Sequence, residues 1–256
     1  MSASSTRPAL LTLSAVLAAA TVLAQIAYPL TTGESLRRLT VTTVVCFAAA
    51  SVTHAIATRG VRWGLTLLAV AGGIGLCAEA VGVRTGMPFG RYAYADSLGS
   101  KLLDVPVIVP LAWVMMSYPC LLLGRRLGHD RTLLVALSGG LTLAAWDLFL
   151  DPQMVAAGHW AWAYPDPALP GIPGIPITNF AGWAVVGVVM IGALDAVLPR
   201  QRATETVPAA LLAWTWIGST VGSAVFFGRP SVAVWGGVAM GICTAPYLLS
   251  LRRQRL

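Results

Sequence analysis

The chain is 256 residues long, and 57% of these are hydrophobic while only 11% are charged. Soluble domains carry about 25% charged residues, so this composition excludes a sizeable soluble domain and predicts one integral membrane domain over residues 1–256. The net charge of +7 does not indicate a nucleic-acid partner. Its basic residues lie in short loops between apolar runs, where they set membrane topology.

Eight apolar runs are long enough to cross a bilayer, which takes roughly 20 helical residues. They cover residues 9–30, 39–57, 63–83, 105–123, 132–150, 177–198, 207–227 and 232–251. The first run follows one basic residue and is longer than a signal-peptide core, so we expect it to be retained as a span. We therefore predict an all-α, polytopic membrane bundle of about eight helices.

The basic residues predict the orientation of this bundle. Eleven of them fall on the side of the N-terminus and six on the opposite side. Because positive residues accumulate in the cytoplasm, we expect a multi-pass protein of the cell membrane with both termini cytoplasmic. The two longest loops, 84–104 and 151–176, then face outward, and they place a functional site toward the outer half of the bilayer.

Two segments, 63–123 and 132–198, repeat one order of features. Glu79 and Asp147 are each followed eleven residues later by Gly-x-aromatic-Ala-aromatic-Ala, and then by a Pro seven residues before a Trp. This match favours an internal duplication over chance. Two hairpins of the same orientation form a parallel repeat about a pseudo-two-fold axis along the membrane normal. Glu79 and Asp147 would then face one another, whereas Asp151 has no counterpart because Val83 stands at the equivalent position.

Acidic side chains in membrane spans are by default functional candidates. Asp147 and Asp151 are four residues apart and share one helix face. A carboxylic acid shielded from water can keep its proton near neutral pH, and aromatic faces stabilise cations. Acids and aromatic side chains together therefore suit a reaction that protonates an isoprenoid double bond and passes through a cation. The catalytic candidates are Asp147, Glu79 and Asp151, and the substrate-binding candidates are Trp146, Trp160, Trp162, Tyr92, Tyr94, Asn179, Phe180 and Trp183.

Less specific interpretations stay open for these residues. The acids could form hydrogen bonds between helices, and the aromatic side chains could form an interfacial belt. The four cysteines lie within apolar runs, without a CxxC pair, and the three histidines are scattered. We therefore predict no metal site and no bound cofactor.

The two repeat segments also carry longer motifs. These are Glu79…Gly86-x-Pro88-Phe89-Gly90-x-Tyr92-x-Tyr94 in the first and Asp147…Asp151-Pro152…Gly158-x-Trp160-x-Trp162…Gly174-Ile175-Pro176-x-x-Asn179-Phe180-x-Gly182-Trp183 in the second. Over residues 60–200 the chain thereby resembles the carotenoid-biosynthesis membrane protein family, which includes hydratases acting on γ-carotene and bisanhydrobacterioruberin.

The resemblance implies cofactor-free hydration of an acyclic or monocyclic carotenoid taken from the lipid phase. Asp147 or Glu79 would protonate the terminal ψ-end double bond, and water would capture the tertiary cation. Asp151, assisted by Asn179, would hold that water or act as the base. Membrane lipid and other carotenoid-pathway enzymes are the further expected partners.

Three other functions remain compatible with the sequence. A cyclase or isomerase would form the same kind of cation but close a ring before water attacks. A transporter would also use parallel repeats and intramembrane acids. A pigment-binding subunit would bind a carotenoid without converting it.

Overall fold

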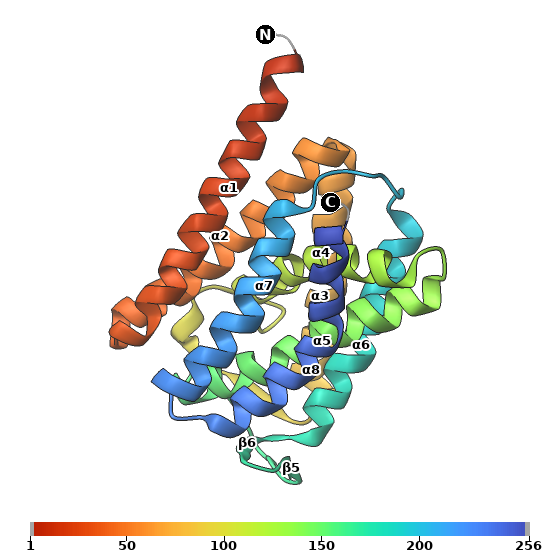
Figure 1. Cartoon of the computed structure of the whole chain (residues 1–256). Helices are drawn as coiled ribbons and strands as arrows, with labels where there is room; N and C mark the ends of the chain where they lie inside the picture. The colour runs from red at the N-terminus through yellow and green to blue at the C-terminus, as the bar shows by residue number, and fades with distance from the viewer. Residues whose placement is uncertain (1–2, 254–256) are drawn as a thin grey trace.

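The computed structural model describes residues 3–253, in which eight helices are long and apolar enough to cross a membrane (Figure 1). They are α1 (Ala3–Ala27), α2 (Gly33–Arg59), α3 (Val61–Thr85), α4 (Ile108–Gly128), α5 (Thr132–Ala156), α6 (Ile177–Val197), α7 (Thr206–Val221) and α8 (Pro230–Arg253). Each predicted span falls on one of these helices. The predicted all-α, polytopic membrane bundle is thus confirmed.

Helices α4 and α5 form the centre of the bundle, and α1 lies at its edge (Figure 1). Every residue from Trp113 to Gly124 of α4 is buried, as expected for a helix that is apolar on all sides. Helix α1 packs mainly along α2 and makes only a minor contact with α7. The centre is therefore well packed, whereas the edge formed by α1 is not.

Short strands and turns lie in the two long loops and at two helix ends. They are η1 (Tyr28–Leu30), β1 (Tyr92–Tyr94), η2 (Asp96–Leu98), β2 (Lys101–Leu102), β3 (Val105–Pro106), β4 (Trp160–Trp162), β5 (Ala168–Leu169), β6 (Ile172–Pro176) and the π-helical turn η3 (Gly222–Phe226). Strand β2 pairs with β3 and β5 with β6, each within its own loop, whereas β1 pairs with β4 across the two loops. The long loops are therefore ordered structure that connects the two hairpins.

The pairing of β1 with β4 has the symmetry expected of the repeat. Tyr92 lies opposite Trp162, Ala93 opposite Ala161 and Tyr94 opposite Trp160. In the sequence repeat Tyr92 corresponds to Trp160 and Tyr94 to Trp162, so Tyr92 pairs with the counterpart of Tyr94, and Tyr94 pairs with the counterpart of Tyr92. Such reciprocal contacts are what a two-fold axis produces, and here the axis passes between the two alanines.

Two further pairs of equivalent residues agree with this axis. The glycines that precede the strands, Gly90 and Gly158, both have a positive φ, +86° and +73°. The indole rings of Trp113 and Trp183 stack with their centroids 3.9 Å apart and an interplanar angle of 13°. The two hairpins therefore meet face to face as a parallel repeat.

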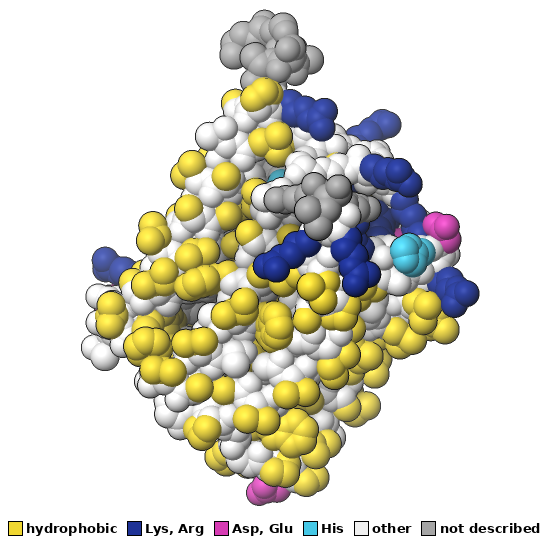
Figure 2. All heavy atoms as spheres, viewed as in Figure 1, with side chains coloured by type: hydrophobic (Ala, Val, Ile, Leu, Met, Phe, Trp, Pro, Cys, Tyr) yellow, Lys and Arg dark blue, Asp and Glu magenta, His cyan; other side chains and the backbone are white. Residues whose placement is uncertain are grey.

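Both described chain ends lie at the same end of the bundle, and the β5–β6 hairpin lies at the other (Figure 1). In the view of Figure 2 most Lys and Arg side chains gather near the chain ends, and an apolar surface covers the middle of the molecule. This distribution agrees with a lipid-embedded bundle. The cytoplasmic placement of the termini stays a prediction.

Candidate functional site

A cavity of about 500 Å³ lies beside β1 and β4, within the size range of small-molecule sites. Of the predicted site residues, nine line it: Glu79, Tyr92, Tyr94, Trp146, Asp151, Trp160, Trp162, Asn179 and Trp183. They come from both hairpins, which bring residues far apart in the sequence to one wall. That wall combines aromatic side chains with two carboxyl groups.

Glu79 is held by three hydrogen-bond donors of its own repeat. The hydroxyls of Tyr92 and Tyr94 donate to its Oε2 at 2.5 and 2.7 Å, and Trp113 Nε1 donates to Oε1 at 3.0 Å. Burial first, and then the charge of Glu79, raises the pKa of both Tyr92 and Tyr94 above the usual value. The two phenols therefore stay protonated, and both carboxyl oxygens of Glu79 act as acceptors.

Asp147 and Asp151 share one donor from the neighbouring helix. Asn179 Nδ2 donates to Asp147 Oδ2 at 2.8 Å and to Asp151 Oδ2 at 2.5 Å, and Trp160 Nε1 donates to Asp151 Oδ1 at 3.1 Å. Asp147 Oδ1 is buried and receives no hydrogen bond from a donor in the described chain. Because both aspartates accept from the same nitrogen, their carboxyl groups lie close together. Two carboxyl groups in such proximity favour a state in which one of them carries a proton.

The three acids form one electrostatic cluster. Glu79 is near enough to interact with Asp147 and with Asp151. None of the three takes part in an ion pair within residues 3–253. Burying several ionised groups without a counter-ion is strongly unfavourable. The cluster is therefore suited to hold a proton next to an apolar space. The catalytic role of Glu79, Asp147 and Asp151 stays a prediction.

Stacked indoles form the aromatic part of the wall. Trp183 stacks on Trp113, and its ring lies edge-on to Trp146 with centroids 6.0 Å apart. Trp162 packs against Tyr92, and Trp160 against Tyr94. Such faces stabilise a nearby cation by roughly 0.5–2 kcal/mol each. The cavity thus combines carboxyl groups with an aromatic surface that favours positive charge.

Comparison with known proteins agrees with this geometry. The sequence profile described as "carotenoid biosynthesis protein" matches residues 39–245. The chain belongs to the carotenoid biosynthesis protein family. The predicted resemblance is thereby confirmed, and the match extends beyond residues 60–200 to include α2, α7 and most of α8.

This family member is also similar to a bisanhydrobacterioruberin hydratase of Haloarcula japonica. The two are 39% identical over 123 residues, which make up 46% of this chain and 40% of the relative. No solved structure matches the chain. The comparisons therefore indicate a protein of carotenoid biosynthesis.

Two of the predicted site residues, Asp147 and Phe180, do not line the cavity. Asp147 is fully buried behind the wall, where it contacts Asp151 and Asn179. Phe180 packs against the hydrophobic core. One residue along a helix turns the side chain by about 100°, so Phe180 cannot share the direction of Asn179. Phe180 therefore lies outside the lining of this cavity, and its contact with substrate stays a prediction.

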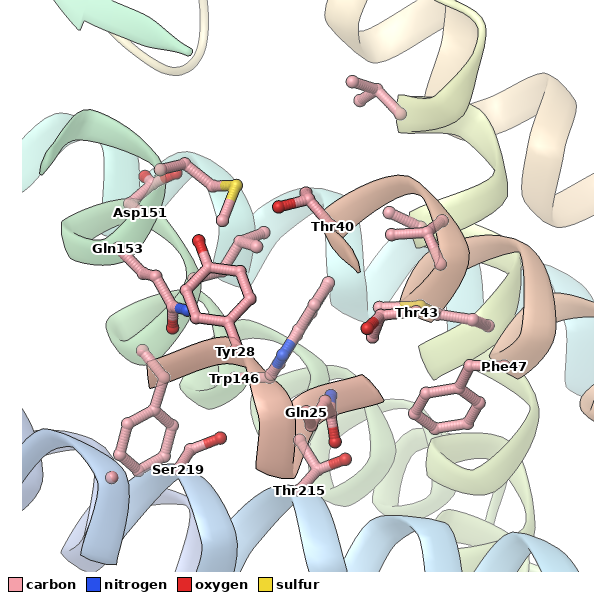
Figure 3. A pocket seen from close by; sticks show the side chains of 18 of the residues that line it. Gln25, Tyr28, Thr40, Thr43, Phe47, Trp146, Asp151, Gln153, Thr215 and Ser219 are labelled. Carbon is pink, nitrogen blue, oxygen red and sulfur yellow. The ribbon is translucent and has the colours of Figure 1, made fainter. Parts of the chain in front are cut away.

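The opposite wall of the cavity was not predicted from the sequence. It is formed by α1 with η1, by α2, and by α7 with η3 and the residue after it. These segments contribute, among others, Gln25, Tyr28, Thr43, Trp214 and Phe227. In Figure 3, Gln25, Tyr28 and Thr43 surround the same space as Trp146 and Asp151. These segments carry no repeated motif, so no pattern in the sequence marked their residues as part of the site.

Proposed function

We propose that this protein adds water to the terminal ψ-end double bond of an acyclic or monocyclic carotenoid. One observation carries the proposal: in a member of the carotenoid biosynthesis family, Glu79 and Asp151 border an apolar, aromatic cavity with Asp147 directly behind them, and none of the three has a counter-ion among the described residues. The similarity to a hydratase supports the choice of water over an internal alkene as the nucleophile.

The first step is proton transfer from the Asp147–Asp151 pair. Asp151 is the member that lines the cavity, and Asp147 lies behind it, so Asp151 is the better donor to substrate. Its proton adds to the less substituted alkene carbon, where the π electrons form a new C–H bond. The other carbon becomes a tertiary cation and Asp151 becomes a carboxylate. Asp147 and Asn179 act as positioning residues for Asp151 through the contacts described above.

The second step is capture of the cation by water. The carboxylate of Glu79, held by its three donors, and the indole faces of Trp146 and Trp183 stabilise the positive charge. A water oxygen supplies the electron pair of the new C–O bond, and one water proton returns to Asp151. The acid pair is restored, and the net change is addition of one water molecule without a redox step or a cofactor.

Pigment analysis in a bacterial host that makes acyclic carotenoids tests this proposal. The parent protein should yield a product heavier by the mass of one water. Asp151→Asn should lower conversion by about 10²-fold or more, the usual contribution of a general acid. Asp96→Asn is the matched control, because this aspartate lies in an exposed turn and pairs only with Lys101 among the described residues.

Each alternative function predicts a different result, either in the pigment analysis or in an uptake assay with vesicles. A product isomeric with the substrate would indicate a cyclase or isomerase, and pigment that purifies unchanged would indicate a binding subunit. Uptake of a polar ligand into vesicles without pigment conversion would indicate a transporter. Hydration at the parent rate in Asp151→Asn would contradict the assignment of the proton donor.

A further inference from the structure

The cavity has a rim on the flank of the bundle. Among the described residues that line it, the exposed ones all belong to two segments, the end of α1 with η1 and the end of α7 with η3. They are Ile26, Leu30, Ile217, Val221 and Phe226, with exposed fractions of 49%, 77%, 54%, 47% and 60%. Residues that both line a cavity and face outward mark where it opens, and all five are apolar.

Two side-chain contacts border this rim. Trp214 Nε1 donates to Gln25 Oε1 at 2.7 Å, and the rings of Tyr28 and Phe227 meet edge to face with centroids 6.1 Å apart. The Tyr28 hydroxyl is buried and has no hydrogen-bond partner in the described chain. Its ring can therefore turn aside without losing a hydrogen bond, and Figure 3 shows it projecting into the cavity.

The rim opens toward lipid because α1 and α7 are membrane-spanning helices with apolar outer surfaces. A water-insoluble polyene is dissolved in the hydrocarbon phase, so its shortest path to the acids avoids water entirely. An opening lined by polar or charged side chains would instead suit a substrate arriving from solution. The chemistry of the rim is thus matched to a long apolar chain.

We propose that the gap between α1 and α7, from Ile26 and Leu30 to Val221 and Phe226, is a lateral portal through which an apolar polyene enters from the bilayer. The proposal deepens the function proposed above and rests on it for the identity of the substrate. One end of the polyene reaches Asp151 and Glu79, and the remainder lies in the portal and in lipid. The enzyme therefore modifies one end of its substrate in each visit.

Enlarging the rim side chains tests the portal. The double variant Ile26→Trp/Val221→Trp places bulk at both sides of the gap, at positions exposed enough to leave the core unchanged. Pigment hydration should fall about tenfold or more, equivalent to a barrier raised by ~1.4 kcal/mol. Val225→Trp is the matched control, because Val225 is 68% exposed on the same turn but does not line the cavity.

A second measurement is independent of hydration. The purified protein is placed in phosphatidylcholine vesicles containing a diazirine-bearing hexadecane, which is photolysed after brief mixing, and labelled peptides are mapped by mass. The parent and Val225→Trp should be labelled at the buried lining residues Met115 and Phe149. In the double variant the yield of label on these two residues should be about tenfold lower.

The two measurements separate the two proposals. Equal labelling of Met115 and Phe149 in the parent and in the double variant would overturn the portal, whatever the pigment assay gives. Labelling that depends on the rim in a protein that hydrates no carotenoid would support the portal and contradict the proposed function.

Discussion

Equivalent acids of the two repeats have different partners. Glu79 is surrounded by Tyr92, Tyr94 and Trp113, all from its own hairpin. Asp147 contacts a second carboxyl group and an amide instead. Glu79 thus accepts three hydrogen bonds, whereas Asp147 and Asp151 share the donor Asn179. The equivalent acids of the two repeats therefore lie in different environments, which suit them to different tasks.

The donors of Glu79 can be tested one at a time. Tyr94→Phe removes the hydroxyl that donates at 2.7 Å and leaves the ring that packs against Trp160. A hydrogen bond to a charged group contributes roughly 1.5–3 kcal/mol, so turnover in the pigment assay should fall by about 10- to 100-fold. Tyr164→Phe, at a residue that is 72% exposed, should leave turnover unchanged. An unaltered rate in Tyr94→Phe would show that Glu79 does not need this donor.

His159 links the β4 loop to the loop after β1 and should make stability depend on pH. Its Nδ1 lies 2.8 Å from Ser97 Oγ, and its Nε2 is buried without a partner in the described chain. Burial, and after it the charge of Arg37, lowers the pKa of His159. The unfolded chain takes up this proton near pH 6.5, but the folded protein does so only at lower pH. The contribution of neutral His159 to the free energy of unfolding is therefore fully present above about pH 6.5, and it is lost as the pH falls below that value.

Thermal unfolding in detergent checks this prediction. Between about pH 7.5 and about pH 5 the parent should lose stability faster than His159→Gln, which cannot bind the proton. His129→Gln, at an exposed loop position, should follow the parent. Parallel curves for the parent and His159→Gln would contradict the prediction.

The helices could be predicted from the sequence, but the strands that join the hairpins could not. Long apolar runs predict spans because a bilayer requires them. Helix α3, for example, extends the predicted span 63–83 by two residues at each end, up to the flanking Gly60 and Gly86. Strands of two to five residues have no measurable periodicity. The pairing of β1 with β4 depends on the pseudo-axis, and so only the repeat could have suggested it.

The stack of Trp113 on Trp183 requires a small residue on α3. A Cβ at Gly75 would lie 2.6 Å from the indole of Trp113, so Gly75→Ala should displace the ring and destabilise the protein by ~1–3 kcal/mol. Gly73→Ala is the matched control, because nothing lies within 4 Å of its Cβ position. It should be neutral or gain up to ~1 kcal/mol from helix propensity. Thermal unfolding of the two variants compares them, and equal midpoints would contradict this role of Gly75.

At the scale of the whole molecule, the sequence predicted one wall of the cavity and missed the other. The acids and aromatic residues of the hairpins recur at matched spacing, so they could be identified as a set. Gln25, Tyr28 and Trp214 belong to separate helices without a shared pattern. Their convergence depends on how α1 and α7 pack around the repeat, which no local signal encodes.

The orientation of the bundle is a prediction that labelling in whole cells can check. In a Cys77→Ala background, a cysteine replacing Asp166 in the β4–β5 loop should react with a membrane-impermeant maleimide in intact cells. A cysteine replacing Gln201, which is exposed between Arg200 and Arg202, should react only after permeabilisation, because basic loops stay cytoplasmic. The reverse pattern would place the termini outside.

The β1–β4 pairing restricts where the chain tolerates changes of length. Eleven residues separate the acid from the glycine in both repeats, whereas sixteen separate Gly90 from Pro106 and eighteen separate Gly158 from Pro176. Inserting one residue before either strand would shift its register and turn its aromatic side chains to the opposite face, away from the acids. An insertion after the strand would only lengthen a loop. Variation in loop length, whether introduced by evolution or by engineering, is thus confined to the stretch after each strand.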